Sequence, residues 1–185
     1  DRIDTSLGFD TVGLDNEAAV KEVCTHLQTK AYQSILVVTE SIAIDPRQAR
    51  IDAIKAFTRE NNDITYEIIE IEKISVDLLI KVIQDFIDSH PNRKKAIFTT
   101  NGVAMMRSAK ALKQLDLHVG SQIGLISIDD PEWAQLFEGG ITVMRQPTNA
   151  IGQTACERLL TRIQGSNEPA QHIKLKAELV IRQST

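Results

Sequence analysis

The chain has 185 residues, a length that fits one large domain or two small lobes. Hydrophobic residues make up 42% of it and charged residues 25%, which is typical of soluble globular proteins. The formal net charge of −4 argues against a broad phosphate-binding face, and no apolar run is long enough to cross a bilayer.

The sequence offers no signature of secretion, metal binding or catalysis. The N-terminus, DRIDTSLGFD, lacks the basic start and apolar core of a signal peptide, and it also lacks a Met, so we expect a fragment or a processed product. Cys24 and Cys156 lie far apart, which favours two free, buried thiols in a reducing cytoplasm. No two histidines have metal-ligand spacing, and no Walker loop, GxSxG or GxGxxG is present. We therefore expect no enzyme, no cofactor and no metal site.

Apolar periodicity predicts an alternation of strands and helices. In chain order we expect strand 11–14, helix 17–29, strand 34–39, helix 45–61, strand 64–71, helix 75–89, strand 96–100, helix 103–115, strand 125–128, strand 141–144, helix 148–164 and strand 172–182. In the last helix, Ile151, Ala155, Leu159 and Ile163 are expected to face inward. This succession predicts an α/β fold, with a parallel sheet and helices on both of its faces.

One stretch, Gly124 to Pro147, contains the clearest candidate for a binding site. The apolar run 125–128 ends in Asp129 and Asp130, and Pro131 forces the strand to stop there. Open α/β sheets bind ligands at the carboxyl ends of their strands, so these carboxylates are candidates for ligand contact. The alternative is a strand with a solvated acidic end.

Several patterns, in order along the whole chain, resemble the effector-binding region of the LacI/GalR family of bacterial transcriptional repressors. They are Asp1-Arg2 with VGLDN at 12–16, His26-Leu27, Arg50 in the helix after SILVVT, Asn101 after AIFTT, ISIDD at 126–130, and the C-terminal third, ITVMRQPTNAIGQTACERLLTRIQG…LVIRQST. The chain departs from the family at Ala31-Tyr32, where Gly-His is usual, and at Gly102, where Asp is usual.

The resemblance implies two similar α/β lobes of the type I periplasmic-binding-protein kind, joined by three crossovers. On that basis 16–140 is the C-terminal lobe and 165–185 returns to it, 1–15 is the last strand of the N-terminal lobe with a crossover, and 141–164 is a strand and helix of the N-terminal lobe. The family's DNA-binding part precedes this region, so operator DNA would be contacted there. The resemblance also implies a cytoplasmic homodimer that does not bind membranes. In a chain beginning at Asp1, helix 148–164 would have lost most of its partners, and its apolar stripe would seek a second copy.

The family resemblance assigns Arg50, Asn101 and Asp129 to an effector site between the lobes. Arg50 can donate a forked pair of hydrogen bonds to sugar hydroxyls or a carboxylate, or else pair with an acidic residue on a helix surface. Asp129 can accept hydrogen bonds from ligand hydroxyls, or serve as a turn carboxylate, the role we expect for Asp130. Asn101 offers a donor and an acceptor, although a left-handed turn residue needs no ligand.

Four further positions are weaker candidates. Asp1 resembles a residue that lines the cleft. Trp133 can stack on a sugar face or anchor its loop on an apolar patch, and Gln146 and Thr148 follow a crossover and are expected to line the cleft.

The sequence therefore predicts the effector-sensing and dimerisation region of a LacI-family repressor, which binds a small sugar or sugar acid. A periplasmic sugar-binding protein of a transporter is the alternative, and it would need an export signal. An enzyme on a doubly wound fold would need a nucleophile, metal cluster or phosphate loop. A protein partner in place of a small effector stays open.

Overall fold

The computed structural model describes residues 8–40, 45–71 and 75–185, so Asp1 lies outside the described residues. The elements are β1 (Thr11–Leu14), α1 (Asn16–Thr29), β2 (Ser34–Thr39), α2 (Asp45–Glu60), β3 (Thr65–Glu70), α3 (Val76–Ser89), β4 (Lys95–Thr99), α4 (Gly102–Gln114), β5 (Gly124–Ile128), the 3-10 helix η2 (Glu132–Gln135), β6 (Thr142–Arg145), α5 (Thr148–Ile163), β7 (His172–Leu175) and β8 (Glu178–Val180).

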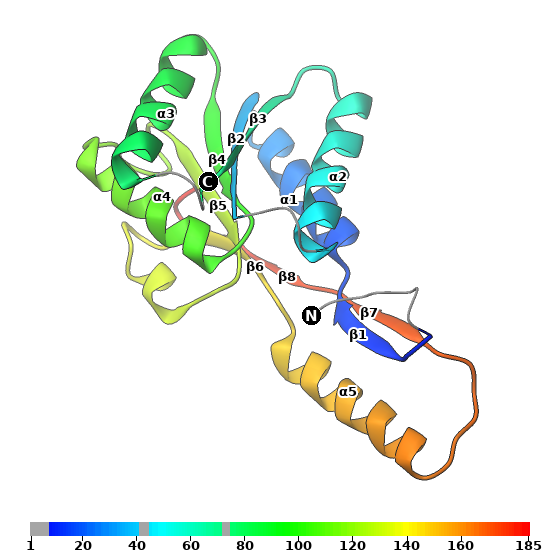
Figure 1. Ribbon diagram of the computed structural model, residues 1–185. Helices are drawn as coiled ribbons and strands as arrows, with labels where there is room; N and C mark the ends of the chain where they lie inside the picture. The colour runs from blue at the N-terminus through cyan, green and yellow to red at the C-terminus, as the bar shows by residue number, and fades with distance from the viewer. Residues whose placement is uncertain (1–7, 41–44, 72–74) are drawn as a thin grey trace.

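A six-stranded sheet in the order β3-β2-β4-β5-β6-β8 forms the main body (Figure 1). Its strands pair in parallel except for β8, which runs antiparallel to β6. Because helices cover both faces, β2 is buried at every position and reads as the continuous apolar run SILVVT. Strand β3 lies at the edge of the sheet and has no buried residue.

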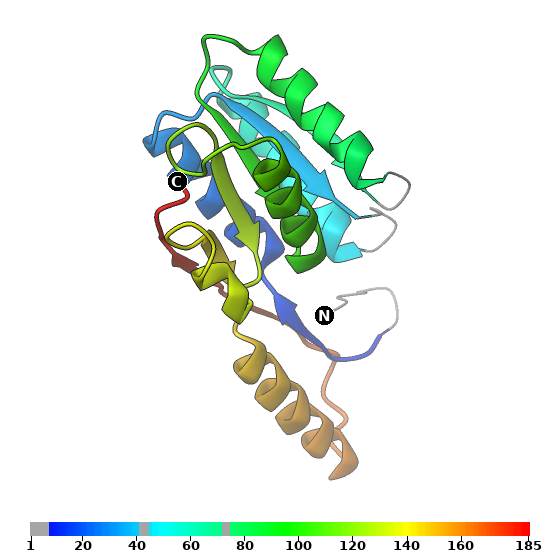
Figure 2. The ribbon, with the colours of Figure 1, turned by 90° about the vertical axis from the view of Figure 1, so that its left-hand side faces the viewer.

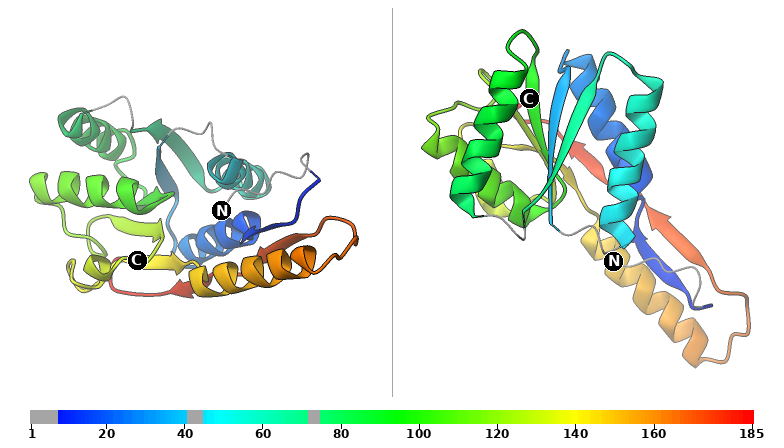
Figure 3. Two further views of the ribbon diagram at one scale, coloured as in Figure 1. Left: turned by 60° about the horizontal axis from the view of Figure 1, so that its bottom comes forward. Right: turned by 45° about the horizontal axis from the view of Figure 1, so that its top comes forward.

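The helices lie on opposite faces of this sheet, α1 and α2 on one and α3 and α4 on the other (Figure 3). Each pair covers its own apolar core, one containing Val20, Leu27 and Ile54 and the other Leu79, Ile83 and Leu112. This three-layer arrangement is the α/β fold that the sequence predicts.

A second, smaller unit projects from the body and consists of the parallel pair β1–β7 and helix α5 (Figures 1 and 2). We refer to these three elements as the arm. No residue of α5 is buried, and Leu159, Leu160 and Ile163 are 60%, 56% and 71% exposed. The prediction that the apolar stripe of α5 faces inward is therefore wrong in this structure, because the helix lies beside only the two-stranded pair β1–β7, which is too small to bury it.

The structure also differs from the sequence prediction in the C-terminal third. Strand β6 was assigned with α5 to the other lobe, but it lies in the large sheet between β5 and β8. Met144 packs in one core and Val143 in the other, which explains why the strand stays with the body. The single strand expected at 172–182 is two strands, of which β7 joins the arm and β8 the large sheet.

Candidate functional site

Four neighbouring strands of the large sheet, β2, β4, β5 and β6, carry polar residues just after their carboxyl ends. These residues are Glu40, Asn101, Asp129 and Gln146, which we call the polar row. Asn101 donates from Nδ2 to Oε2 of Glu40 at 2.6 Å. Asp129 accepts from the backbone N–H of Gly102 at 2.9 Å and from Nε2 of Gln146. Hydrogen bonds therefore connect these strand ends across the edge of the sheet where α/β folds bind ligands.

A cavity of about 750 Å³ opens beside Asp129 and Gln146. Its lining combines strand ends, the turn after β5 and the first residues of α5, namely Gly102, Asp129, Asp130, Pro131, Arg145, Gln146, Pro147, Thr148, Asn149 and Ala150. The volume suits a small-molecule ligand. Three predicted site residues, Asp129, Gln146 and Thr148, therefore line one cavity.

Asp129 has an unusual backbone conformation, with φ at 84°. Left-handed backbone costs a non-glycine residue about 1–2 kcal/mol. Its N–H donates to the carbonyl of Met144 at 3.1 Å, which fixes this turn against β6. Backbone strain of this kind tends to occur at functional sites, where it aims a side chain in a required direction.

Arg50 is 4% exposed, and its side chain reaches the end of β4. Its Nε donates to Oδ1 of Asn16 at 2.7 Å, and its Nη1 donates to the carbonyl of Thr100 at 2.5 Å. Burial lowers the pKa of the Arg50 guanidinium, and the nearby negative charge of Asp129 opposes that change. The alternative of a surface arginine paired with an acid does not describe this buried side chain, which joins α2 to α1 and to the end of β4.

Asn101 caps helix α4, with Oδ1 accepting from the backbone N–H of Ala104 at 2.9 Å. Its φ of −163° is extended, so the left-handed turn expected as an alternative is wrong. Since the other end of its carboxamide donates to Glu40, protein groups hold both ends of this side chain.

The sequence prediction did not include Glu40 or Arg47. Glu40 Oε2 also accepts from Nη2 of Arg47 at 2.6 Å, and the two side chains are 20% and 18% exposed. A signal for Glu40 was present in the sequence, because it follows the apolar run of β2 just as Asp129 follows that of β5.

Trp133 lies in η2, is partly buried, and packs against the core on the α3–α4 face together with Phe137. It does not line the cavity beside Asp129. This position corresponds to the anchoring alternative, in which the indole attaches its loop to an apolar patch.

Asp130 stabilises the turn rather than facing open solvent. Its side chain is 4% exposed and pairs with Arg145 at 2.7 Å and with Arg182 at 2.8 Å. Burial alone would raise the pKa of this carboxyl, but the hydrogen bonds from Arg182 and Arg145 outweigh it, so the pKa is lowered.

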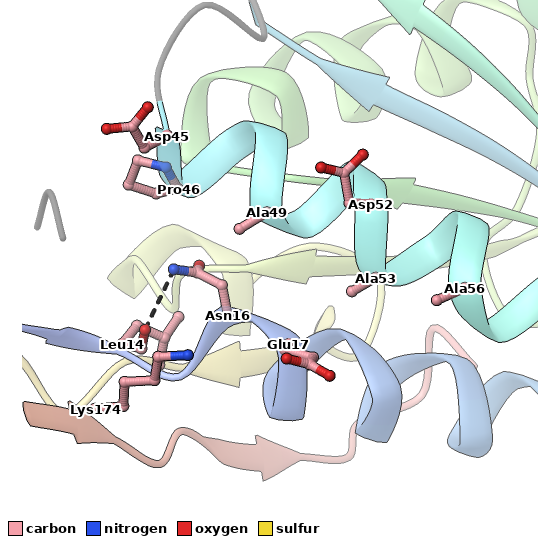
Figure 4. Close-up of a pocket in the computed structure, with 10 residues that line it drawn as sticks. All are labelled: Leu14, Asn16, Glu17, Asp45, Pro46, Ala49, Asp52, Ala53, Ala56 and Lys174. Atoms are coloured by element: carbon pink, nitrogen blue, oxygen red, sulfur yellow. Dashed lines mark hydrogen bonds between the residues drawn. The ribbon is translucent and has the colours of Figure 1, made fainter. Parts of the chain in front are cut away.

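A second cavity of about 510 Å³ lies between the start of α1, one side of α2 from Asp45 to Ala56, and strand β7 (Figure 4). Figure 4 shows Ala49, Ala53 and Ala56 along the side of α2 that lines it, with Asn16 donating to the carbonyl of Leu14. The predicted site residues within the described chain do not line this cavity. Asn16, which accepts from Arg50, connects its wall to the end of β4, where Arg50 donates to the carbonyl of Thr100.

The described residues contain neither a cluster of metal ligands nor a helix that could cross a membrane. In residues 8–40, 45–71 and 75–185 no group of three or more His, Cys, Asp or Glu side chains is placed to hold a metal ion. None of the helices within these ranges has the length and apolar character needed to cross a membrane.

Comparison with known proteins agrees with this fold. The family described as periplasmic binding protein-like domain matches residues 24–185. The HTH-type transcriptional regulator PtxS of Pseudomonas aeruginosa is 35% identical over 188 residues, and KdgR of Bacillus subtilis is 33% identical over 186 residues. All of this chain is covered in both cases, but the chain spans only about half of either relative, 54% and 55%.

Among solved structures, a periplasmic binding protein/LacI transcriptional regulator from Alkaliphilus metalliredigens, complexed with D-xylulofuranose, superposes with a TM-score of 0.82. The two are 21% identical, and the match covers 96% of this chain and 66% of that one. The fold is thus that of a type I periplasmic-binding-protein-like domain, as predicted. The chain belongs to the periplasmic binding protein-like domain family, and the predicted resemblance to LacI/GalR-type regulators is confirmed.

Proposed function

We propose that the chain is the effector-binding region of a LacI-type transcriptional repressor, and that a small sugar or sugar acid binds along the polar row, with its contacts to Asp129 and Gln146 in the cavity of about 750 Å³. The observation that carries this proposal is the connected set of polar groups at the strand ends beside that cavity. Carboxylates and carboxamides at a strand edge suit a ligand with many hydroxyl groups. The Alkaliphilus protein of the same fold, which holds a sugar, supports the proposed ligand class.

The direct ligand contacts belong to Asp129, Gln146 and Thr148, which line the cavity. Arg50 supports the end of β4 by donating to the carbonyl of Thr100, and Asn101 follows that same strand, which lies next to β5. Asp1 and Trp133 complete the set predicted from the sequence, Asp1 as a residue of the cleft and Trp133 as the support of the loop after β5.

A ligand in the cavity beside Asp129 would contact both the body and the arm. The cavity joins Asp129 of the body to Thr148, Asn149 and Ala150 at the start of α5, which belongs to the arm. A ligand that binds one arrangement of body and arm more tightly shifts the population toward it. In the full-length homodimer, that shift changes the affinity of a DNA-binding region outside this chain for its operator.

We further propose that residues 16–140 and most of 165–185 form one lobe, and that 1–15 and α5 belong with the other. A transporter's periplasmic binding protein is the alternative function. Its relatives would be expected to be transport components, whereas PtxS and KdgR are transcriptional regulators, so the repressor is favoured.

The test is calorimetry on the full-length protein with a panel of D-ribose, D-xylulose, D-glucose, cellobiose and gluconate. For a panel member that binds, Asp129→Asn should weaken binding about 10-fold or more, because a hydrogen bond to a charged group contributes roughly 1.5–3 kcal/mol. Asp88→Asn, the same change on the exposed face of α3, is the matched control and should bind as the wild type does.

Equal affinity of Asp129→Asn and wild type would contradict a ligand site at the end of β5. In the same assay, unchanged affinity in Arg50→Ala would remove Arg50 from the site. Failure of every sugar to bind the wild-type protein would contradict the proposed function itself.

A further inference from the structure

Glu40 is the member of the polar row that the sequence prediction did not contain. It follows β2 directly, and its strand lies next to β4 in the sheet. Its side chain is 20% exposed, at the same strand edge as Asp129. We propose that Glu40 is a specificity-determining residue of the effector site, which accepts a hydrogen bond from a ligand hydroxyl. This inference rests on the proposed function.

The carboxylate of Glu40 is held in place from two sides. Arg47 of α2 and Asn101 at the start of α4 both donate to Oε2, each at 2.6 Å. Short hydrogen bonds to a charged group are strong and directional, so they orient the whole carboxylate. A carboxylate offers about four acceptor positions, and these two donors occupy two of them.

Asn101 is less suited to this role than Glu40. Its Oδ1 accepts from Ala104 and its Nδ2 donates to Glu40, so its carboxamide already serves the protein at both ends. At this end of the polar row, Glu40 is therefore the residue that can accept a hydrogen bond from the ligand. Asn101 becomes a bridge between Glu40 and the start of α4.

The row then presents two carboxylates, Glu40 after β2 and Asp129 after β5, with β4 between them. Ionised carboxylates only accept hydrogen bonds, so both positions select hydroxyl donors. They also disfavour a ligand carboxylate at the same points, since two negative charges would face each other. A polyhydroxyl ligand that spans the row must place a hydroxyl at each, and any acidic group of the ligand must lie elsewhere.

The experiment uses full-length protein and calorimetry. The tightest binder of the sugar panel is compared with its series of mono-deoxy analogues, first in wild type and then in Glu40→Ala. Wild type should bind each analogue that lacks a recognised hydroxyl about 10-fold or more weakly. In Glu40→Ala, one analogue should bind as well as the parent sugar, because its missing hydroxyl no longer has a partner. The other analogues should keep their wild-type discrimination.

A purely structural role gives a different result, because a loosened Asn101 weakens the parent sugar and every analogue by the same factor. That uniform loss would overturn the proposal, as would unchanged discrimination throughout the series. Glu60→Ala, at the far end of α2, is the matched control, and Glu40→Gln is the second variant should truncation prevent folding. If wild type binds no panel sugar, the proposed function fails together with this inference, whereas a result confined to Glu40 leaves that function standing.

Discussion

The body and the arm use helices of similar pattern in opposite ways. Helix α1 has 14 residues and buries seven of them, whereas α5 has 16 and buries none. Both carry apolar residues at helical spacing. The difference is the surface beneath them, because α1 lies over the large sheet and α5 lies beside the two-stranded pair β1–β7 (Figure 3). An apolar stripe therefore predicts that a helix forms, and does not predict what covers it.

Ion pairs, rather than buried apolar side chains, connect the elements of the arm. Asp10 accepts two hydrogen bonds from Arg162, at 2.8 Å each, and one from the backbone N–H of Gln171 at 2.7 Å. The Arg162 guanidinium and that N–H hold the pKa of Asp10 well below its usual range. Because no residue of α5 is buried, these ion pairs are not backed by an apolar core, and we expect the arm to open more readily than the body.

The largest effect should come from a matched pair of leucine truncations in the 185-residue chain. Leu112 in α4 is fully buried and Leu159 in α5 is 60% exposed. Leu112→Ala should lower the free energy of unfolding by about 2–5 kcal/mol, because it leaves a cavity in the core. Leu159→Ala should change it by less than about 0.5 kcal/mol, as a surface substitution does. Urea denaturation measures both.

Similar losses for the two variants in this chain would contradict the contrast between body and arm. The same pair in full-length protein sharpens it. If the other lobe covers α5 there, the cost of Leu159→Ala should rise toward that of Leu112→Ala.

A smaller effect is expected at Asp130, the buried carboxylate of the body. Asp130→Asn leaves Arg182 without its charged partner and should lower the free energy of unfolding by about 2–3 kcal/mol. This is less than for a fully enclosed pair, because Arg145 is 45% exposed.

The pKa of Asp130 is lowered from 3.8 in the folded protein, so its contribution to stability is present above that value and is lost as the pH falls through the lowered pKa. Denaturation at several pH values should show wild type and variant converging below about pH 4. A constant gap down to pH 2 would exclude this origin.

The sequence predicted local structure well because local structure depends on near neighbours. The apolar run of β2 and the helix expected at 17–29 are both found where they were expected, and Asp15 caps that helix by accepting from the backbone N–H of Ala18. What it missed depends on distant partners. Nothing local distinguishes β7 from β8, since one alternating pattern runs through both, and only pairing with β1 and with β6 separates them.

The site follows the same rule. Asp129 could be predicted because it ends an apolar run and because the family resemblance assigns a role to it, and Gln146 and Thr148 because they follow a crossover. Glu40 ends a similar run, but its significance depends on Asn101, which lies 61 residues away along the chain. The order of the strands in the sheet decides which strand ends lie side by side. The apolar periodicity of the sequence carries no information about that order.

The smallest effect concerns the two cysteines, which were both predicted to be buried. Cys24 in α1 is buried, and burial raises the pKa of its thiol to about 12, whereas Cys156 in α5 is exposed, so that prediction is wrong for Cys156. Thiol labelling at neutral pH should therefore modify Cys156 quickly and Cys24 only as fast as the body unfolds. Cys156→Ser should change the free energy of unfolding by less than about 0.5 kcal/mol and abolish the fast phase. Fast labelling that persists in Cys156→Ser would mean that Cys24 becomes accessible without unfolding, and that α1 is held no more firmly than α5.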